Sequence, residues 1–398
     1  MELGASGPAR TLDEVVDEIA AEATRRFGPF LAQRVAPGAV ERDSTSTPID
    51  RAVLAEAAAL GLLKQSIPSA IGGEGPDLLH RGVTLEQVGY LCVDQSFPLL
   101  VSVFEEIARE VAASGRQELA ETYGRRLVES ELLGAFAYSD GTDPFTFKSK
   151  ATTVGGGYRL DGYKPIVTGA ALADLFIVYV AIEGGDLAAF VVERSDPGVT
   201  VMPRAVSGMR AAGIGSITME DVRLPAWRML YEEDGLSSAQ RFLNARRVLH
   251  SCAPLGCMRS ILERSIASLH ETVRYGSLLS DAPNVQATLG RMYAAVETSR
   301  SVTHRALSRA SAGLADAFFD PVASAAKHTV TELAIRTALD AMRLAGGEGY
   351  ISDNHYERWH RDFTGLIAGA GTQDTLEMNL GALAVGNWEA AMERSEER

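Results

Sequence analysis

The sequence predicts an α+β fold in which a β segment is inserted between two helical segments. Apolar residues recur at steps of three and four up to residue 133, gather in short runs after it, and regain the helical period after residue 236. No Gly-x-Gly-x-x-Gly motif or P-loop occurs, which argues against a parallel nucleotide-binding sheet. We therefore expect a helical domain over residues 1–133, a β domain over 134–236 and a second helical domain over 237–398.

The first helical segment is indicated by apolar stripes such as Leu12, Val15, Ile19 and Ala23. Residues 67–76 are too rich in glycine and proline to be helical, so they predict a structured loop.

Five short apolar runs predict the strands of the middle segment, and glycine-rich stretches between them predict turns. The runs lie at 135–138, 158–160, 175–180, 188–192 and 216–219. Their close spacing is typical of a small antiparallel barrel or sandwich.

The third segment begins with an apolar stripe from Leu255 to Val273, and Pro254 just before it predicts a kink or a late helix start. Asn284 is a good cap for a second helix, and Asp320 followed by Pro321 predicts a third that ends near residue 346. A last helix is expected from about residue 372 to 392.

Composition excludes several classes of protein. Asp and Glu number 52 against 38 Lys and Arg, so a nucleic-acid partner is not expected. The three cysteines fit neither a disulfide framework nor a metal site. No signal peptide or membrane-spanning run is visible, so a cytoplasmic location is expected.

Several motifs, in this order and spacing, give the chain a resemblance to the acyl-CoA dehydrogenase family of flavoproteins, and it runs over nearly the whole chain. The motifs that resemble the family's lie at residues 68–75, 134–144, 160–169, 208–210, 220–225, 346–350, 361–362 and 369–372. The resemblance implies a helical domain, a middle β domain and a C-terminal four-helix domain. It also implies bound FAD, a homo-oligomer, and oxidation of an acyl thioester carried on CoA or on a carrier protein.

The resemblance also assigns cofactor positions. Tyr138 and Ser139 match residues at the pyrimidine edge of the flavin, Thr168 matches a residue near the flavin N5, and Ile166 replaces a Trp that usually lies against the ring. Tyr275, Gly347, Thr372 and Asp374 match other cofactor positions, and Arg343 stands where the family has a Gln. Arg274 substitutes for a family Arg that reaches across the subunit interface, because that position itself holds Thr272.

The catalytic carboxylate of the family has no counterpart here. Most relatives place a Glu where this chain has Ala370, whose backbone N–H would still bind the thioester carbonyl. Other relatives place it on the helix after the β domain, where this chain has Arg246 or, with a one-residue gap, Ala245. Both places therefore lack a carboxylate. Thr142 and Gly371 match substrate-binding positions.

Two side chains are candidate replacement bases. Glu105 and its neighbour Glu106 lie on the helix that lines the acyl pocket in relatives, and their register turns one toward the pocket and the other about 100° away. His250 follows Arg246 by one helical turn. Arg246 and Arg247 are expected to bind an anionic group of the substrate.

Three functions stay open. The first is a flavin-dependent oxidation of an acyl thioester with altered chemistry. The second is a non-catalytic subunit of a heteromeric acyl-CoA dehydrogenase, and the third is a flavin monooxygenase of the same fold.

Overall fold

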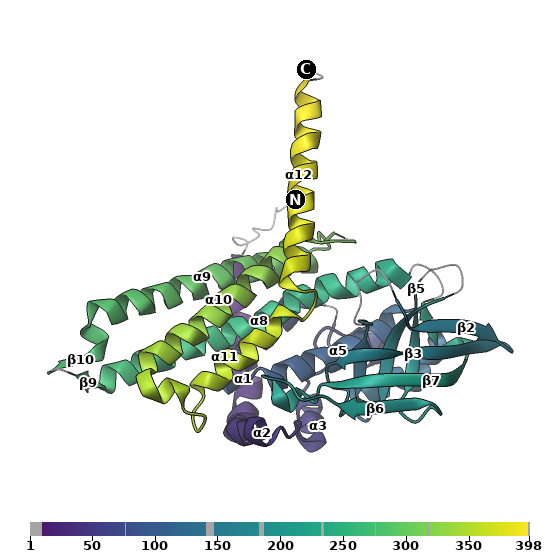
Figure 1. The fold of residues 1–398 in the computed structure, drawn as a ribbon, viewed down its shortest axis with the longest axis horizontal. Coiled ribbons are helices and arrows are strands. Elements are labelled where there is room, and N and C mark those ends of the chain that lie inside the picture. Colours follow the sequence, from purple (N-terminus) through teal and green to yellow (C-terminus); the bar gives the residue numbers. More distant parts are fainter. Residues whose placement is uncertain are drawn as a thin grey trace, which may run out of the picture.

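The chain is elongated, with a bundle of helices at one end and a β domain at the other (Figure 1). The computed structural model describes residues 10–75, 77–140, 147–182, 187–231, 235–274, 276–316 and 318–396, with side chains up to residue 390. Among these residues no helix is both long and apolar enough to cross a membrane.

The N-terminal region is helical, as the apolar stripes predict. Its helices are α1 (Leu12–Phe30), α2 (Ala39–Thr45), α3 (Arg51–Ala59), α4 (Leu78–Cys92), α5 (Ser96–Ala113), α6 (Gln117–Leu119) and α7 (Arg125–Val128). Thr11 caps α1 and forms a capping box with Glu14. Almost the whole circumference of α5 is buried, so this helix lies at the centre of the molecule.

The middle region forms one eight-stranded sheet in the order β6-β7-β3-β2-β4-β5-β8, with β1 paired to β4 outside this path. The strands are β1 (Gly134–Ala137), β2 (Lys150–Val154), β3 (Gly157–Val167), β4 (Leu175–Ala181), β5 (Leu187–Glu193), β6 (Val199–Pro203), β7 (Gly215–Pro225) and β8 (Met229–Tyr231). The expected purely antiparallel sheet needs correction, because β1 runs parallel to β4 and β2 pairs with β4 in parallel through one residue. The sheet is therefore mixed.

Gly134 shows why β1 lies where it does. A Cβ atom at Gly134 would lie 2.4 Å from Cγ2 of Ile107, so only glycine lets the first strand pass this close beneath α5. The strand therefore delivers the following residues, 138–140, to the junction between the sheet and the helices.

The C-terminal helices are α8 (Gly235–Glu271), α9 (Pro283–Ser311), α10 (Pro321–Ala345), α11 (Tyr356–Thr364) and α12 (Gln373–Glu396). A two-stranded hairpin of β9 (Val273–Arg274) and β10 (Ser277–Leu278) follows α8. The late helix start predicted at Pro254 is wrong, because α8 begins 19 residues earlier and continues through it. Asp320 caps α10 as predicted, accepting a 2.6 Å hydrogen bond from the backbone N–H of Ala323.

Close contact between α4 and α8 supports this long helix. A Cβ at Gly89 would lie 2.1 Å from the carbonyl oxygen of Ala253, and one at Gly256 would lie 1.8 Å from that of Glu86. The two glycines thus let the backbones approach, and burial on α4 holds α8 in place across its proline.

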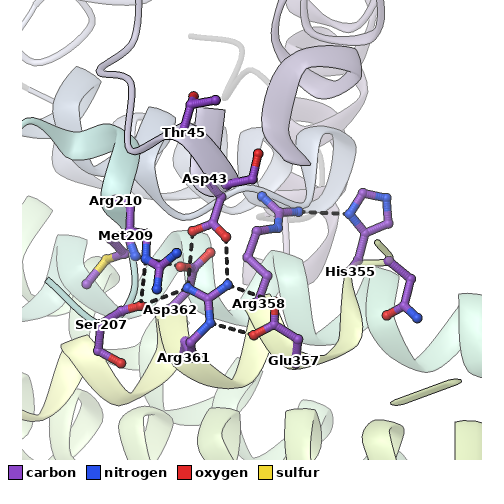
Figure 2. A network of polar contacts seen from close by, with 12 residues as sticks. Asp43, Thr45, Ser207, Met209, Arg210, His355, Glu357, Arg358, Arg361 and Asp362 are labelled. Atoms are coloured by element: carbon purple, nitrogen blue, oxygen red, sulfur yellow. Dashed lines mark hydrogen bonds and ion pairs between the residues drawn. The ribbon is translucent and has the colours of Figure 1, made fainter. Parts of the chain in front are cut away.

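A polar junction joins the three regions of the chain (Figure 2). Arg361 of α11 donates to Asp43 of α2, to Glu357 one turn earlier, and to the backbone carbonyl of Ser207 in the β region. The neighbouring Asp362 accepts a 2.5 Å hydrogen bond from the backbone N–H of Met209. This junction fixes the angle between the sheet and both sets of helices.

Candidate active site

A short loop before α12, residues 369–371, lies where α8 and α10 meet. Ala370 and Gly371 both adopt positive φ, at 56° and 100°. The Nε of Arg247 donates to the carbonyl of Ala370 at 3.2 Å, and the Nζ of Lys327 donates to that of Gly371 at 2.9 Å. Two buried cations therefore hold the backbone of this loop in a conformation that is rare for alanine.

Burial changes the acid–base properties of both cations. It lowers the pKa of Lys327 to about 8 and that of Arg247 to about 10. The positive charge of Arg247 lowers the pKa of Lys327 further. Lys327 also donates to Ile367 O and to Oε1 of Gln373, so its ammonium group has three acceptors. The loop thus lies in a positive environment suited to a polarised carbonyl oxygen.

A small cavity of about 20 Å³ lies beside this loop, which is room for about one water molecule. Its apolar wall includes Leu85, Pro98, Leu99, Leu249 and Leu366. Its polar wall is formed by Gln95, Ser102, Arg246 and His250. The chamber is therefore mostly apolar, with a few polar groups in its wall.

His250 presents an unpaired nitrogen within this wall. Its ring hydrogen-bonds to the backbone carbonyl of Leu366, while its Nε2 is buried and has no hydrogen-bond partner among the described residues. A Cβ at Gly369 would lie 2.8 Å from Nε2, so the ring lies directly against the 369–371 loop. Burial lowers the pKa of His250 well below its usual range, and the positive charges of Arg246 and Lys327 lower it further. The ring is therefore neutral and Nε2 is a hydrogen-bond acceptor.

Arg246 is paired within the protein. Its Nη1 donates to both carboxylate oxygens of Glu106, at 3.0 and 2.9 Å, and to the hydroxyl of Ser102 at 3.1 Å. Glu106 is only 1% exposed. The expectation that Arg246 and Arg247 form an anion site is not supported by this arrangement, because Glu106 neutralises the first and Ala370 and Asn244 accept from the second.

Glu105 points away from the cavity, as the 100° step between neighbouring helix positions requires. It forms an ion pair with the buried Arg81 of α4 and accepts from the backbone N–H of Ser66 at 2.6 Å. Burial raises its pKa, and Arg81 opposes that change. The structure therefore brings Glu106, His250 and Arg246 to the cavity region and leaves Glu105 outside it.

Residues predicted to contact a cofactor fall into two groups. In the first, Tyr138 and Ser139 follow β1, and the buried Lys164 of β3 donates to the Tyr138 carbonyl at 2.8 Å while pairing with Asp140. Thr168, just after β3, is half-buried, and Ile166 near the end of β3 is 61% exposed. An exposed apolar side chain beside hydroxyl groups fits the face and edge of a flat aromatic ring such as a flavin.

Thr372 belongs to this first group through the 369–371 loop. Its hydroxyl accepts from the backbone N–H of Thr375 at 3.2 Å and so caps the start of α12, while Asp374 lies in the first turn of that helix. The start of a long helix also suits a phosphate group.

The second group lies toward the far end of the helical domain, where Figure 1 shows β9 and β10. Arg247 contacts the 369–371 loop, and Arg274 follows the end of α8 at Glu271, about 36 Å further along at 1.5 Å per residue. Gly347 follows the end of α10, and Arg343 in its last turn pairs with Asp340. The two groups of predicted cofactor residues therefore lie far apart within one chain. Tyr275 and Thr142 lie outside the described residues.

Lys327 is the residue that sequence reasoning missed. It takes a place in the buried stripe Ala323, Lys327, Val330 and Ala334, which advances by four, three and four. A lysine at an apolar position of a helix is a signal that its ammonium group has buried partners.

Three family models match consecutive parts of the chain. They are described as the N-terminal domain (residues 18–131), the middle domain (137–222) and the C-terminal domain (233–384) of acyl-CoA dehydrogenase.

Known proteins are similar over most of their length. A cyclohex-1-ene-1-carbonyl-CoA dehydrogenase of Geobacter metallireducens is 29% identical over 83% of this chain and 88% of its own. An L-prolyl-(peptidyl-carrier protein) dehydrogenase of Pseudomonas fluorescens is 28% identical over 79% and 85%. Among solved structures, the prolyl acyl carrier protein oxidase AnaB has a TM-score of 0.87 at 22% identity, covering 94% of this chain and all of that one. Butyryl-CoA dehydrogenase from Megasphaera elsdenii has a TM-score of 0.85 at 22% identity, over 96% and 100%.

Proposed function

Because the chain belongs to the acyl-CoA dehydrogenase family, whose curated and structural relatives are flavin oxidoreductases, we propose that it oxidises an acyl thioester with FAD. The acyl group would be carried on CoA or on a carrier protein, since relatives of both kinds are similar to the chain. The α+β fold, with helical, β and helical domains, is that of the family.

The observation that carries this proposal is the 369–371 loop beside the cavity. Arg247 and Lys327 fix the loop by its carbonyl groups, at Ala370 and Gly371. We infer that the backbone N–H of Ala370 donates to the thioester carbonyl, while Gly371 lines its approach. A donor held in place before the reaction stabilises negative charge as it develops on that oxygen.

The residues at the end of β1 and β3 would hold a flavin ring, with Ile166 as its apolar contact and Ser139 and Thr168 as its hydrogen-bonding groups. Bound FAD would supply a hydride acceptor. Thr372 and the start of α12 would hold polar or phosphate groups of the cofactor. Arg274, Arg343 and Gly347 would serve the site of a second chain.

We propose that the chemistry departs from ordinary dehydrogenation, because the two family positions for a base hold Ala370 and Arg246. Glu105 is enclosed by Arg81 and Ser66, and the lowered pKa of His250 makes it a weak proton acceptor. Loss of a positioned base costs about 10²- to 10⁴-fold in rate. A substrate with an acidic α proton, or one that loses a carboxylate or sulfinate group, would avoid that cost.

Anaerobic spectroscopy of the purified protein tests this function. We expect a flavin absorption band that bleaches when a thioester substrate is added. A stable protein without the band would favour the non-catalytic subunit. A band that no thioester bleaches, together with oxygen consumption by the chemically reduced protein, would favour the monooxygenase.

We further propose a cytoplasmic homo-oligomer. Met378, Val385 and Trp388 of α12 are 61%, 56% and 65% exposed, and their spacing of seven and three puts them on one face of a helix that extends from the body (Figure 1). A second chain would cover this face and complete the cofactor site. The cytoplasmic location is supported by the cysteines, which are buried and unpaired.

A further inference from the structure

We propose that the cavity beside the 369–371 loop is a subsite for a hydroxyl group on a short acyl chain, an inference that rests on the proposed function. The subsite is formed by His250 and Arg246, one helical turn apart on α8, with Ser102 of α5 opposite. Its volume of about 20 Å³ accepts a group about the size of one water molecule.

His250 supplies the acceptor. Its other ring nitrogen bonds to the carbonyl of Leu366, which leaves the lone pair of Nε2 facing its surroundings without a donor. A buried polar atom without a partner costs free energy, typically about 1–3 kcal/mol, until a ligand or water satisfies it. A ligand that enters the cavity therefore gains by donating a hydrogen bond to this atom.

Arg246 supplies the donor. Among the described residues, the hydrogen bonds of Arg246 to Glu106 and Ser102 all use Nη1, and the side chain still lines the cavity. The planar guanidinium has further N–H groups at Nε and Nη2 that can donate to a ligand oxygen. Glu106 neutralises the positive charge, so the subsite offers hydrogen bonds without net charge.

A hydroxyl matches this pair of groups because it donates one hydrogen bond and accepts others. A carboxylate would accept from Arg246 but would meet the lone pair of Nε2, and the pair with Glu106 removes the charge that would attract it. An ammonium group would donate to Nε2 but would lie beside the guanidinium. A plain methyl group would leave Nε2 unsatisfied.

The position of the subsite ties it to the acyl end of the substrate. The His250 ring lies against Gly369, and the next residue, Ala370, is the proposed donor to the thioester carbonyl. Leu99, Leu249 and Leu366 line the same cavity around the position proposed for the hydroxyl.

Calorimetric titration of the full-length holoprotein tests the proposal with butyryl-CoA and with its 3-hydroxy and 4-hydroxy derivatives. At least one hydroxylated thioester should bind about tenfold more tightly than butyryl-CoA, since one extra hydrogen bond to a buried group contributes roughly 1.4 kcal/mol. His250→Phe, which keeps a flat ring but removes the acceptor, should abolish that preference, measured as the ratio of hydroxylated to butyryl-CoA affinity within the same variant. His328→Phe, on the partly exposed face of α10, is the matched control and should keep the preference.

The outcomes separate this proposal from the proposed function. If butyryl-CoA binds as tightly as both hydroxylated thioesters, the cavity holds only a water molecule and the subsite is overturned, while thioester binding still stands. If the preference persists in His250→Phe, it does not depend on this residue and the proposal is equally overturned. If none of the thioesters binds and the flavin band is absent, the proposed function fails as well. Should His250→Phe not fold, the ratio of affinities in the wild-type protein decides.

Discussion

Asp362 is a buried carboxyl group whose protonation couples pH to stability. Burial raises its pKa to about 7, against the opposing influence of Arg358 and the Met209 N–H. In the unfolded chain an Asp has a pKa of about 3.9, so between about pH 4 and pH 7 the folded state holds a proton that the unfolded state has lost. Stability from this group is therefore complete below about pH 4 and is lost as pH rises toward 7.

We expect Asp362→Asn to flatten the pH dependence of the melting temperature between about pH 4.5 and 7.5. In the wild type, this group alone lowers the free energy of unfolding by up to about 1.4 kcal/mol per pH unit across that window. Asp353→Asn, at an exposed position, should leave the profile unchanged. Equal slopes for the wild type and Asp362→Asn would show that Asp362 does not titrate in this range.

Lys327 is the residue on which the geometry of the 369–371 loop depends most. Lys327→Met keeps the length of the side chain but removes the donor for Ile367 O, Gly371 O and Gln373 Oε1. Leaving these acceptors without a donor should cost about 2–3 kcal/mol in unfolding free energy and weaken thioester binding about tenfold. Chemical denaturation and calorimetric titration measure the two effects, with Lys150→Met on the exposed side of β2 as control. A loop that does not need this lysine would show normal thioester affinity at reduced stability.

The residues of the candidate site differ in how far the sequence could predict them. The sequence predicts that Arg246 and His250 lie close together, because a step of four puts both on one face of a helix. The sequence does not predict the pairing of Arg246 with Glu106, because these residues are 140 positions apart and meet only after α5 packs against α8. For the same reason the sequence could not tell that Arg81 encloses Glu105.

At the scale of elements, periodicity predicted the order of helices, strands and helices, while three strands were missed, including the three-residue β8 (Met229–Tyr231). Lys150–Val154 has a largely polar sequence, and Val199–Pro203 forms an exposed edge, so neither gives a run of apolar residues. The parallel pairing of β1 also has no local signal, since it depends on how the chain returns from α7. Pro254 was expected to kink α8 or to delay its start, and the start is not delayed because tertiary packing against α4 outweighs the local effect of the proline.

Helix α12 allows a test of the proposed oligomer. Its exposed apolar face includes Val385 and Trp388, and a charge placed there should oppose burial by a second chain. We expect Trp388→Glu to shift the mass measured by light scattering toward the monomer. Asn387→Glu adds the same charge at the adjacent exposed position, off the apolar stripe, and should leave the mass unchanged. A wild-type protein that is already monomeric would contradict the proposed assembly.

At the scale of the whole molecule, the separation of the two groups of predicted cofactor residues leads us to predict that, under the proposed function, each FAD site is shared between chains. Thr168 directly follows β3, whose Lys164 donates to the Tyr138 carbonyl, whereas Arg274 lies beyond the far end of α8, about 36 Å along that helix from Arg247. We expect Thr168→Val and Arg274→Glu each to weaken FAD binding in a homo-oligomer. The reason is that every site in such an assembly carries the defect, whichever chain supplies it.

Co-expression of the two variants with different affinity tags distinguishes shared sites from sites within one chain. In a mixed pair of chains, shared sites place both defects in one site and leave the other intact, so about half of the sites should bind FAD with wild-type affinity. Sites built within one chain would each keep one defect, and no tight site would appear. Flavin fluorescence during titration of the doubly purified mixed oligomer measures the fraction of tight sites. Recovery of that half-occupancy from two defective parents would require a cofactor site completed by a second copy of the chain.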